Sequence, residues 1–118
     1  MKTFLAVYLG TPDSRQRREW DSLDEATRKQ REAAGMKAWH DFGAKYHAVT
    51  TVEGGPLGKT KKASAHGITD VKNNMAGFTI VKAESHEAAA KMFENHPHFS
   101  IFPGESVEIM EILPIPGR

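Results

Sequence analysis

The sequence contains no cysteine, and this absence removes several kinds of chemistry. Disulfide bonds, thiolate nucleophiles and thiolate metal sites are all excluded. Long hydrophobic runs are also missing, so no segment has the length of a membrane-spanning helix. The apolar stretch near the N-terminus is short and runs into Thr11-Pro12-Asp13, without the pattern of an export signal. We therefore expect a soluble, cytoplasmic protein with no membrane partner.

An excess of charge of one sign is missing as well. The 16 Lys and Arg residues nearly balance the 15 Asp and Glu residues, and the formal net charge is +1. This balance gives no electrostatic reason to expect a nucleic acid partner. The lysines between positions 59 and 72 have no interleaved aromatic residues, which is typical of a solvated loop; an anionic ligand is the alternative. The length of 118 residues predicts a single domain over residues 1–118.

Six segments have the patterns of regular structure. Ser22 and Glu25 are spaced as a capping box, and Gly35, inside the helix that follows, indicates a kink or a close packing contact. Residues 56–75 lack periodicity and predict a long loop or a loose hairpin. The expected elements in order are a strand over 3–9, a helix over 22–46, strands over 47–53 and 76–84, a helix capped by Ser85, and a strand over 106–112.

This order of elements predicts an α+β fold. We expect a ferredoxin-like βαββαβ protomer, with a four-stranded antiparallel sheet and both helices on one face. No further expected element covers the second face of the sheet, although apolar residues occur at both odd and even positions of the strands. Exposed apolar surface of this extent usually marks an interface. The sequence therefore predicts a homodimer in which two open sheet faces meet.

Two histidines flank a proline after the second helix. His96 follows Met92 by four residues and Phe93 by three, so it should leave the helix on its buried face. Capping of the helix C-terminus is the alternative role for His96, and we assign His98 to the surface. Two imidazoles in an extended segment could share a metal ion, but no third ligand stands at motif spacing. We expect neither a metal nor a cofactor.

Several stretches resemble one known family. They are GGPLG at 54–58, GFTIVKAES at 77–85, HPHF at 96–99, VEI at 107–109 and Ala38-Trp39. Together they are similar to the YCII-related (YciI-like, DGPF) family of small dimeric α/β-barrel proteins, over roughly the last two thirds of the chain. The resemblance implies ferredoxin-like protomers, a homodimer and a polar cavity between sheet and helices. Most members have no assigned activity, and a few look like lyases acting on halogenated or hydroxylated aromatic rings.

The family also implies site residues. Some members pair a histidine on the first helix with an aspartate placed before a proline after the second helix. The pre-proline position here is His96, and only His40 could supply the first imidazole. This departure favours a different set of site residues, with His96 at its centre. The remaining histidines, His47, His66 and His86, are assigned to the surface.

Four further residues complete the predicted site. Trp39 lies at helical spacing with other aromatic residues, which is typical of a core and is also suited to the wall of an aromatic-ligand pocket. Gly55 would let the backbone turn sharply at the rim of the cavity. Asn74 could orient a ligand or make an Asx turn. Asp70 is the nearest acid in the same loop that could serve His96.

Three functions remain open at this point. In the first, the protein is a small enzyme in which His96 acts as general acid or base in a proton-transfer or elimination reaction on a small substrate such as an aromatic ring. In the second, the same cavity holds a small ligand without catalysis, as in a binding or accessory module. In the third, the chain is a structural dimer with a vestigial cavity.

Overall fold

The computed structural model describes residues 1–117, which form a four-stranded sheet, a separate two-stranded hairpin and a set of helices. In chain order the elements are β1 (Lys2–Leu9), α1 (Arg15–Asp21), α2 (Glu25–Lys45), the 3-10 helix η1 (His47–Val49), β2 (Thr50–Pro56), β3 (Thr60–Ser64), β4 (Gly67–Val71), β5 (Met75–Ala83), α3 (His86–Met92), α4 (Pro97–Ser100) and β6 (Ser106–Glu111).

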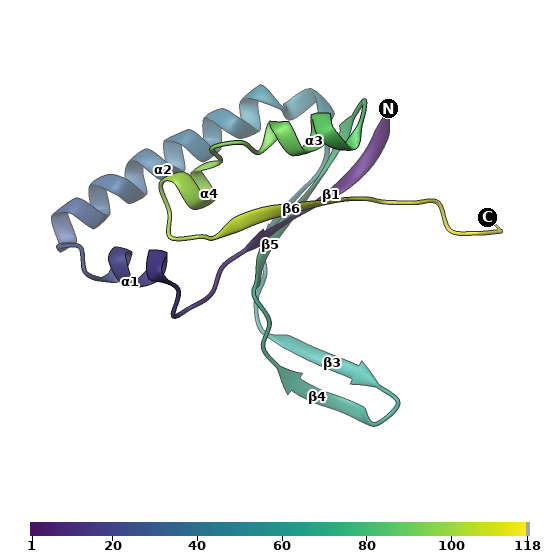
Figure 1. The fold of residues 1–118 in the computed structure, drawn as a ribbon, viewed down its shortest axis with the longest axis horizontal. Coiled ribbons are helices and arrows are strands. Elements are labelled where there is room, and N and C mark those ends of the chain that lie inside the picture. The colour runs from purple at the N-terminus through teal and green to yellow at the C-terminus, as the bar shows by residue number, and fades with distance from the viewer. Residues whose placement is uncertain (118) are drawn as a thin grey trace.

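The main sheet has the strand order β2-β5-β1-β6, and every neighbouring pair is antiparallel. Leu5 in the central strand β1 lies opposite Ile80 of β5 and Met110 of β6. The helices lie on one side of this sheet (Figure 1). The predicted ferredoxin-like α+β fold is therefore confirmed.

The core lies between the sheet and the helices, and the two-residue period of β1 determines which side chains enter it. Phe4, Ala6 and Tyr8 alternate along β1 and all point toward the helices. They pack with Val81 from β5 and Phe93, which follows α3 directly. Burial of aromatic and aliphatic side chains of this size is the main favourable term that holds the helices on the sheet.

The N-terminal helical region differs from the prediction. Ser22 does not begin the long helix, because it is the C-cap residue of the unpredicted helix α1. Asp24 is the N-cap residue of α2, and its side chain makes no capping hydrogen bond, so the predicted capping box is wrong. Helix α1 is held by Trp20, which is buried against Phe102 at 5.8 Å between ring centroids. That tertiary contact has no signal in the local sequence.

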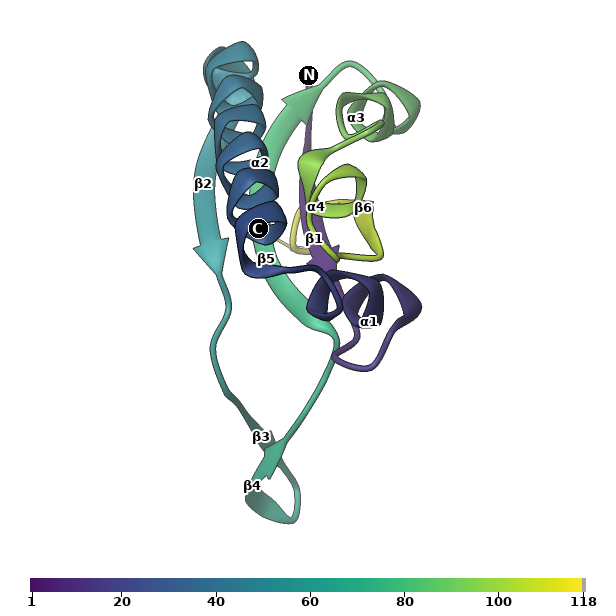
Figure 2. The ribbon, with the colours of Figure 1, turned by 90° about the vertical axis from the view of Figure 1, so that its left-hand side faces the viewer.

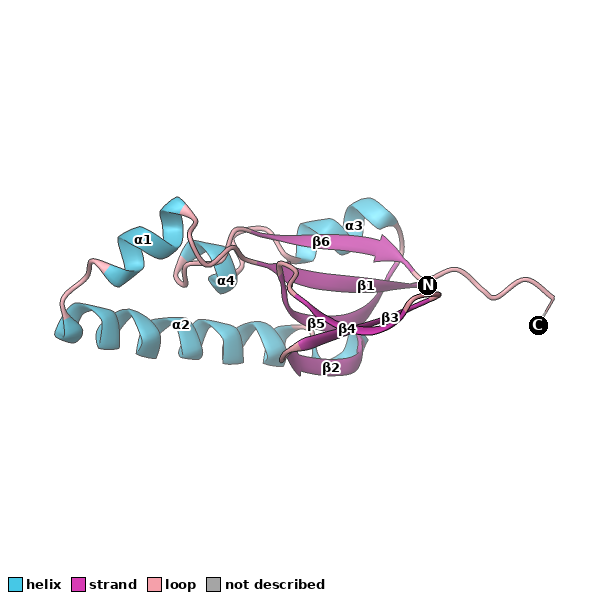
Figure 3. Cartoon of the chain, turned by 90° about the horizontal axis from the view of Figure 1, so that it is seen from below, coloured by secondary structure: helices cyan, strands magenta, loops and turns pink. Residues whose placement is uncertain are grey.

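Helix α2 is long enough to extend beyond the end of the sheet, where it runs beside α1 (Figure 3). Gly35 is the buried residue of α2. A Cβ atom at this position would lie 2.5 Å from the ring of Phe102, so only glycine lets the ring approach the helix. The predicted close packing contact at Gly35 is confirmed.

The segment between β2 and β5 forms a hairpin, one of the two predicted alternatives. Strands β3 and β4 pair with each other and extend away from the main sheet (Figure 2). Lys61 of β3 forms an ion pair with Asp70 of β4 at 2.7 Å. Just before β2, the predicted strand over 47–53 is corrected, because His47–Val49 form a 3-10 helix and the strand begins at Thr50.

The second half of the chain follows the prediction more closely. Ser85 caps α3, since its hydroxyl oxygen accepts a hydrogen bond from the Ala88 N–H at 3.1 Å. The short helix α4 was not predicted, and His96 is its N-cap residue.

The second face of the sheet carries Leu5, Ile80 and Met110, and no helix among residues 1–117 covers it (Figure 1).

Candidate functional site

A cavity of about 730 Å³ lies between α2 and the side of the sheet formed by β2 and β5. Helix α2 supplies one wall, and the ends of β2 and β5 supply the other. The aromatic residues that line the cavity are Tyr8, Trp39, Phe42, Phe78 and Phe102. The polar side chains that line it are His40, His47, Thr50, Glu53 and Thr79. A volume in this range, with apolar walls and few polar groups, is typical of small-molecule sites.

The aromatic wall is made by side chains from different elements. The rings of Tyr8 from β1 and Trp39 from α2 have centroids 5.1 Å apart. Phe102, from the loop before β6, lies 6.2 Å from Trp39 and extends the same wall. Aromatic pairs at such separations are mutually attractive, so the wall keeps its shape without a ligand.

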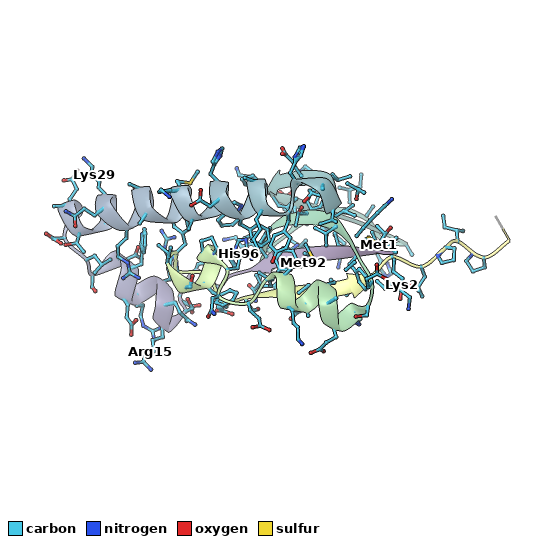
Figure 4. The ribbon with its side chains drawn as sticks, turned by 90° about the horizontal axis from the view of Figure 1, so that it is seen from above. Met1, Lys2, Arg15, Lys29, Met92 and His96 are labelled. Carbon is cyan, nitrogen blue, oxygen red and sulfur yellow. The ribbon has the colours of Figure 1, made fainter. Side chains whose placement is uncertain are left out.

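His96 lies behind this wall, in the interior of the molecule (Figure 4). Its exposed fraction is 1%, and it is absent from the lining of the cavity. The ring centroids of Trp39 and Phe42 lie 4.6 and 4.5 Å from that of His96, both with edge-to-face geometry. The predicted inward direction of His96 is correct, and the rings of Trp39 and Phe42 separate its side chain from the cavity.

The two nitrogens of His96 have different surroundings. Nδ1 accepts a hydrogen bond from the backbone N–H of His98 at 3.0 Å, which caps the first turn of α4. Among residues 1–117, Nε2 has no hydrogen-bond partner. An accepting Nδ1 places the proton of the neutral ring on Nε2. The side chain therefore presents a buried N–H donor to the surrounding aromatic rings.

Burial controls the protonation of this histidine. Desolvation, together with the neighbouring charge of His98, lowers the pKa of His96 to about 4. The imidazolium loses its hydration inside the apolar cluster, so the neutral form is favoured. His96 is therefore neutral near pH 7.

His98 is buried, and its predicted assignment to the surface is wrong. Its Nε2 donates a hydrogen bond to the carbonyl oxygen of Leu9 at 2.8 Å, across 89 positions of sequence. Burial lowers the pKa of His98, although the Leu9 hydrogen bond acts in the opposite direction. Gly104 packs directly on the His98 ring, where a Cβ atom would overlap it. His98 thus ties α4 to the end of β1.

Three of the residues predicted for the site lie together. Trp39, His40 and Gly55 all line the cavity, the first two from α2 and the third from β2. Helical geometry explains the first wall, because Trp39 and Phe42 lie one turn apart and His40 lies toward the rim. The surface assignments of His66 and His86 agree with their exposure.

Two other predicted residues lie elsewhere in the structure. Asp70 is on the extended hairpin, paired with Lys61, with 84% of its side chain exposed. Asn74 lies in the bend before β5, where its backbone carbonyl oxygen accepts a hydrogen bond from the backbone N–H of Gly10 at 2.9 Å. Neither residue lines the cavity, so this loop does not supply the predicted acid to the site.

Sequence reasoning missed three groups that reach the cavity. Tyr8 was assigned only to a strand, and its pKa is raised to about 12 by burial. His47 is exposed, as its surface assignment predicted, and it also lines the cavity from the 3-10 helix after α2. Glu53 directly precedes Gly54 and Gly55, so its position next to the predicted rim was also visible in the sequence.

No group of three or more His, Asp or Glu side chains among residues 1–117 is arranged to hold a metal ion. Within the same described range, no helix combines the length and the apolar character needed to cross a membrane.

Comparison with known proteins supports the fold. No protein-family model and no curated protein matches this chain. Its structure is similar to that of 5-chloro-2-hydroxyhydroquinone dehydrochlorinase from Burkholderia phenoliruptrix AC1100, solved in complex with 2,5-dihydroxybenzoquinone. The two share 22% sequence identity, the TM-score is 0.50, and the match covers 92% of this chain and 90% of the dehydrochlorinase. This likeness agrees with the ferredoxin-like arrangement of sheet and helices.

Proposed function

We propose that the cavity beside α2 binds a small ring compound and that the protein is a small lyase-like enzyme acting on it. The observation that carries this proposal is the cavity itself, about 730 Å³ in volume with Tyr8, Trp39 and Phe102 along its wall. Flat aromatic walls favour a flat ligand, because stacking and burial of apolar area act on the same face. The structurally similar dehydrochlorinase, which was solved with a hydroxylated quinone, supports the same ligand class.

The chemistry would be a proton transfer or an elimination. In an elimination, a base removes a proton from the substrate, the electrons of the broken bond form a double bond, and the leaving group departs with its own electron pair. His40 is the predicted catalytic residue that lines the cavity, so we assign it the role of this base. His96 becomes a positioning residue, because its ring supports Trp39 and Phe42 from behind.

One observation favours the alternative, a binding module without catalysis. His96 is buried, its pKa is lowered to about 4, and aromatic rings stand between it and the cavity. A general base must come within hydrogen-bond reach of its proton. If no ring that binds is turned over, the cavity would hold a ligand and leave it unchanged.

The test has two steps. Binding of hydroquinone, hydroxyhydroquinone and cyclohexanol is measured by calorimetry, and we expect the flat rings to bind and the non-planar cyclohexanol to bind much more weakly. Turnover of a chlorinated hydroxyhydroquinone is then followed by chloride release, with His40→Asn as the variant and His66→Asn as the matched surface control. Absence of binding by every flat ring would refute the proposed ligand class. Binding without chloride release would leave the binding module, whereas release unaffected by His40→Asn would refute His40 as the base.

We further propose that the protein is a homodimer of the YCII-related type, formed through the open face of the sheet. Val52, Met110 and Ile112 have exposed fractions of 44%, 42% and 45%, and the strands that carry Val52 and Met110 belong to the main sheet. Apolar side chains on a sheet face that no helix covers favour burial against a second copy. The sequence resemblance at residues 77–85 and 96–99 points to the same arrangement.

A further inference from the structure

The lining of the cavity divides into two chemically different parts. The interior is aromatic, with Tyr8 and Trp39 in contact. The polar part contains the imidazoles of His40 and His47 and the carboxylate of Glu53. Among residues 1–117, Glu53 is the only acidic residue of the lining, and no Lys or Arg side chain lines the cavity. The fixed charge of this lining is therefore negative.

The backbone of β2 determines the position of Glu53. The pairing of β2 with β5 shifts register between Val52 and Gly55, so Glu53 and Gly54 lie in an irregular stretch of the strand. Gly54 has a φ of 67°, and a Cβ atom there would overlap the carbonyl oxygen of Phe78. Irregularities of this kind redirect side chains and often lie next to functional sites. Glycine at position 54 thus allows the backbone turn directly after Glu53, which lines the cavity.

A single acidic residue in the lining, itself exposed to solvent, distinguishes between ligands. It accepts a strong hydrogen bond from a ring hydroxyl group, because one partner carries a charge. Its carboxylate repels a ring that carries a carboxylate of its own, since two like charges close together are unfavourable. Within the described range, no Lys or Arg of the lining offsets that repulsion.

We propose that Glu53 makes the cavity selective for hydroxylated rings over carboxylated rings. This inference rests on the proposed function and names the residue that determines the ligand class. Glu53 accepts the hydrogen bond of one ring hydroxyl, and the ring lies against Trp39. The imidazoles of His40 and His47, which can donate or accept, serve a second hydroxyl group.

The inference is tested by calorimetric titration of the full chain with hydroquinone and with benzoate. We expect the unmodified protein to bind hydroquinone at least tenfold more tightly than benzoate. Glu53→Gln removes the charge at nearly constant shape, and it should weaken hydroquinone binding about tenfold, the effect of one charged hydrogen bond. The same variant should strengthen benzoate binding, so the preference should shrink or reverse.

Two further variants make the test specific. Glu53→Asp keeps the charge, so it should still bind hydroquinone more tightly than benzoate, a preference that an unfolded chain would not show. Glu87→Gln removes an exposed carboxylate from α3, outside the cavity lining, and should change neither affinity. Equal binding of both rings by the unmodified protein, or unchanged affinities in Glu53→Gln, would overturn the inference and leave the proposed function standing. If neither hydroquinone nor benzoate binds, both the inference and the proposed function are refuted.

Discussion

The backbone N–H of His98 donates a hydrogen bond to Nδ1 of His96 at 3.0 Å, and this contact links the two buried histidines. It caps α4 and places the proton of the neutral His96 ring on Nε2. His98 in turn donates from its own Nε2 to the Leu9 carbonyl oxygen at 2.8 Å. The pair therefore connects the sheet to the aromatic cluster behind the cavity.

This burial predicts that stability falls in acid. The pKa of His96 is about 4 in the folded protein and has an ordinary value of 6.5, so the unfolded chain binds more protons between these values. The free energy of unfolding should therefore decrease as the pH falls from about 6.5 to about 4, by at most roughly 3 kcal/mol from His96 alone. The lowered pKa of His98 acts in the same direction. Urea unfolding at pH 7.5 and pH 4.5 measures the loss.

Carboxyl groups also titrate in this range, so the acid effect needs a matched variant. His96→Asn removes the imidazole and should lose clearly less stability between pH 7.5 and pH 4.5 than the unmodified protein. His40→Asn, on an exposed position of α2, should lose as much as the unmodified protein. Equal losses in His96→Asn and the unmodified protein would contradict the assignment.

Two replacements of His96 should separate the stability contributed by its buried ring from that contributed by its capping hydrogen bond. His96→Ala removes a fully buried ring and the capping acceptor, and we expect a loss of about 3 kcal/mol or more. Asn is a good N-cap residue, so His96→Asn should be more stable than His96→Ala by about 1 kcal/mol at pH 7.5. Denaturant midpoints of the two variants give the difference. Equal midpoints would show that the hydrogen bond to the His98 N–H does not contribute.

Two glycines of α2 should respond oppositely to alanine. Gly35→Ala places a Cβ atom against the Phe102 ring and should destabilise the protein by about 1–3 kcal/mol. Gly43→Ala meets no atom within 4 Å and should stabilise it by about 0.5–1 kcal/mol, because alanine favours the helix. Thermal unfolding of both variants compares them in the same helix. A stabilising Gly35→Ala would contradict the close approach of Phe102.

The proposed dimer predicts the effect of a charge on the open sheet face. Met110→Lys places an ammonium group on β6, opposite Leu5, where a second sheet would cover it. We expect this variant to be a monomer at concentrations at which the unmodified chain is a dimer, as measured by analytical ultracentrifugation. Met36→Lys, on α2, should keep the dimer. A monomeric unmodified chain at micromolar concentration would refute the proposed interface.

The sequence determined the main features of the fold. The β-branched and aromatic runs, the helix after Ser85 and the order of elements predicted the antiparallel sheet with helices on one face, and local periodicity carries this information. The same periodicity predicted the inward direction of His96, since it continues the buried face of Met92 and Phe93. The close contact at Gly35 was likewise visible as a glycine inside a helical pattern.

Only the tertiary structure decided the surroundings of these residues. His98 is buried because Leu9, 89 positions away, accepts its hydrogen bond and Gly104 leaves room for its ring. Asp70 lies away from the cavity because β3 and β4 pair with each other, and Glu53 lies at the cavity because β2 is irregular beside β5. Local sequence patterns determine which face of an element is apolar, whereas long-range pairing and packing determine which side chains meet.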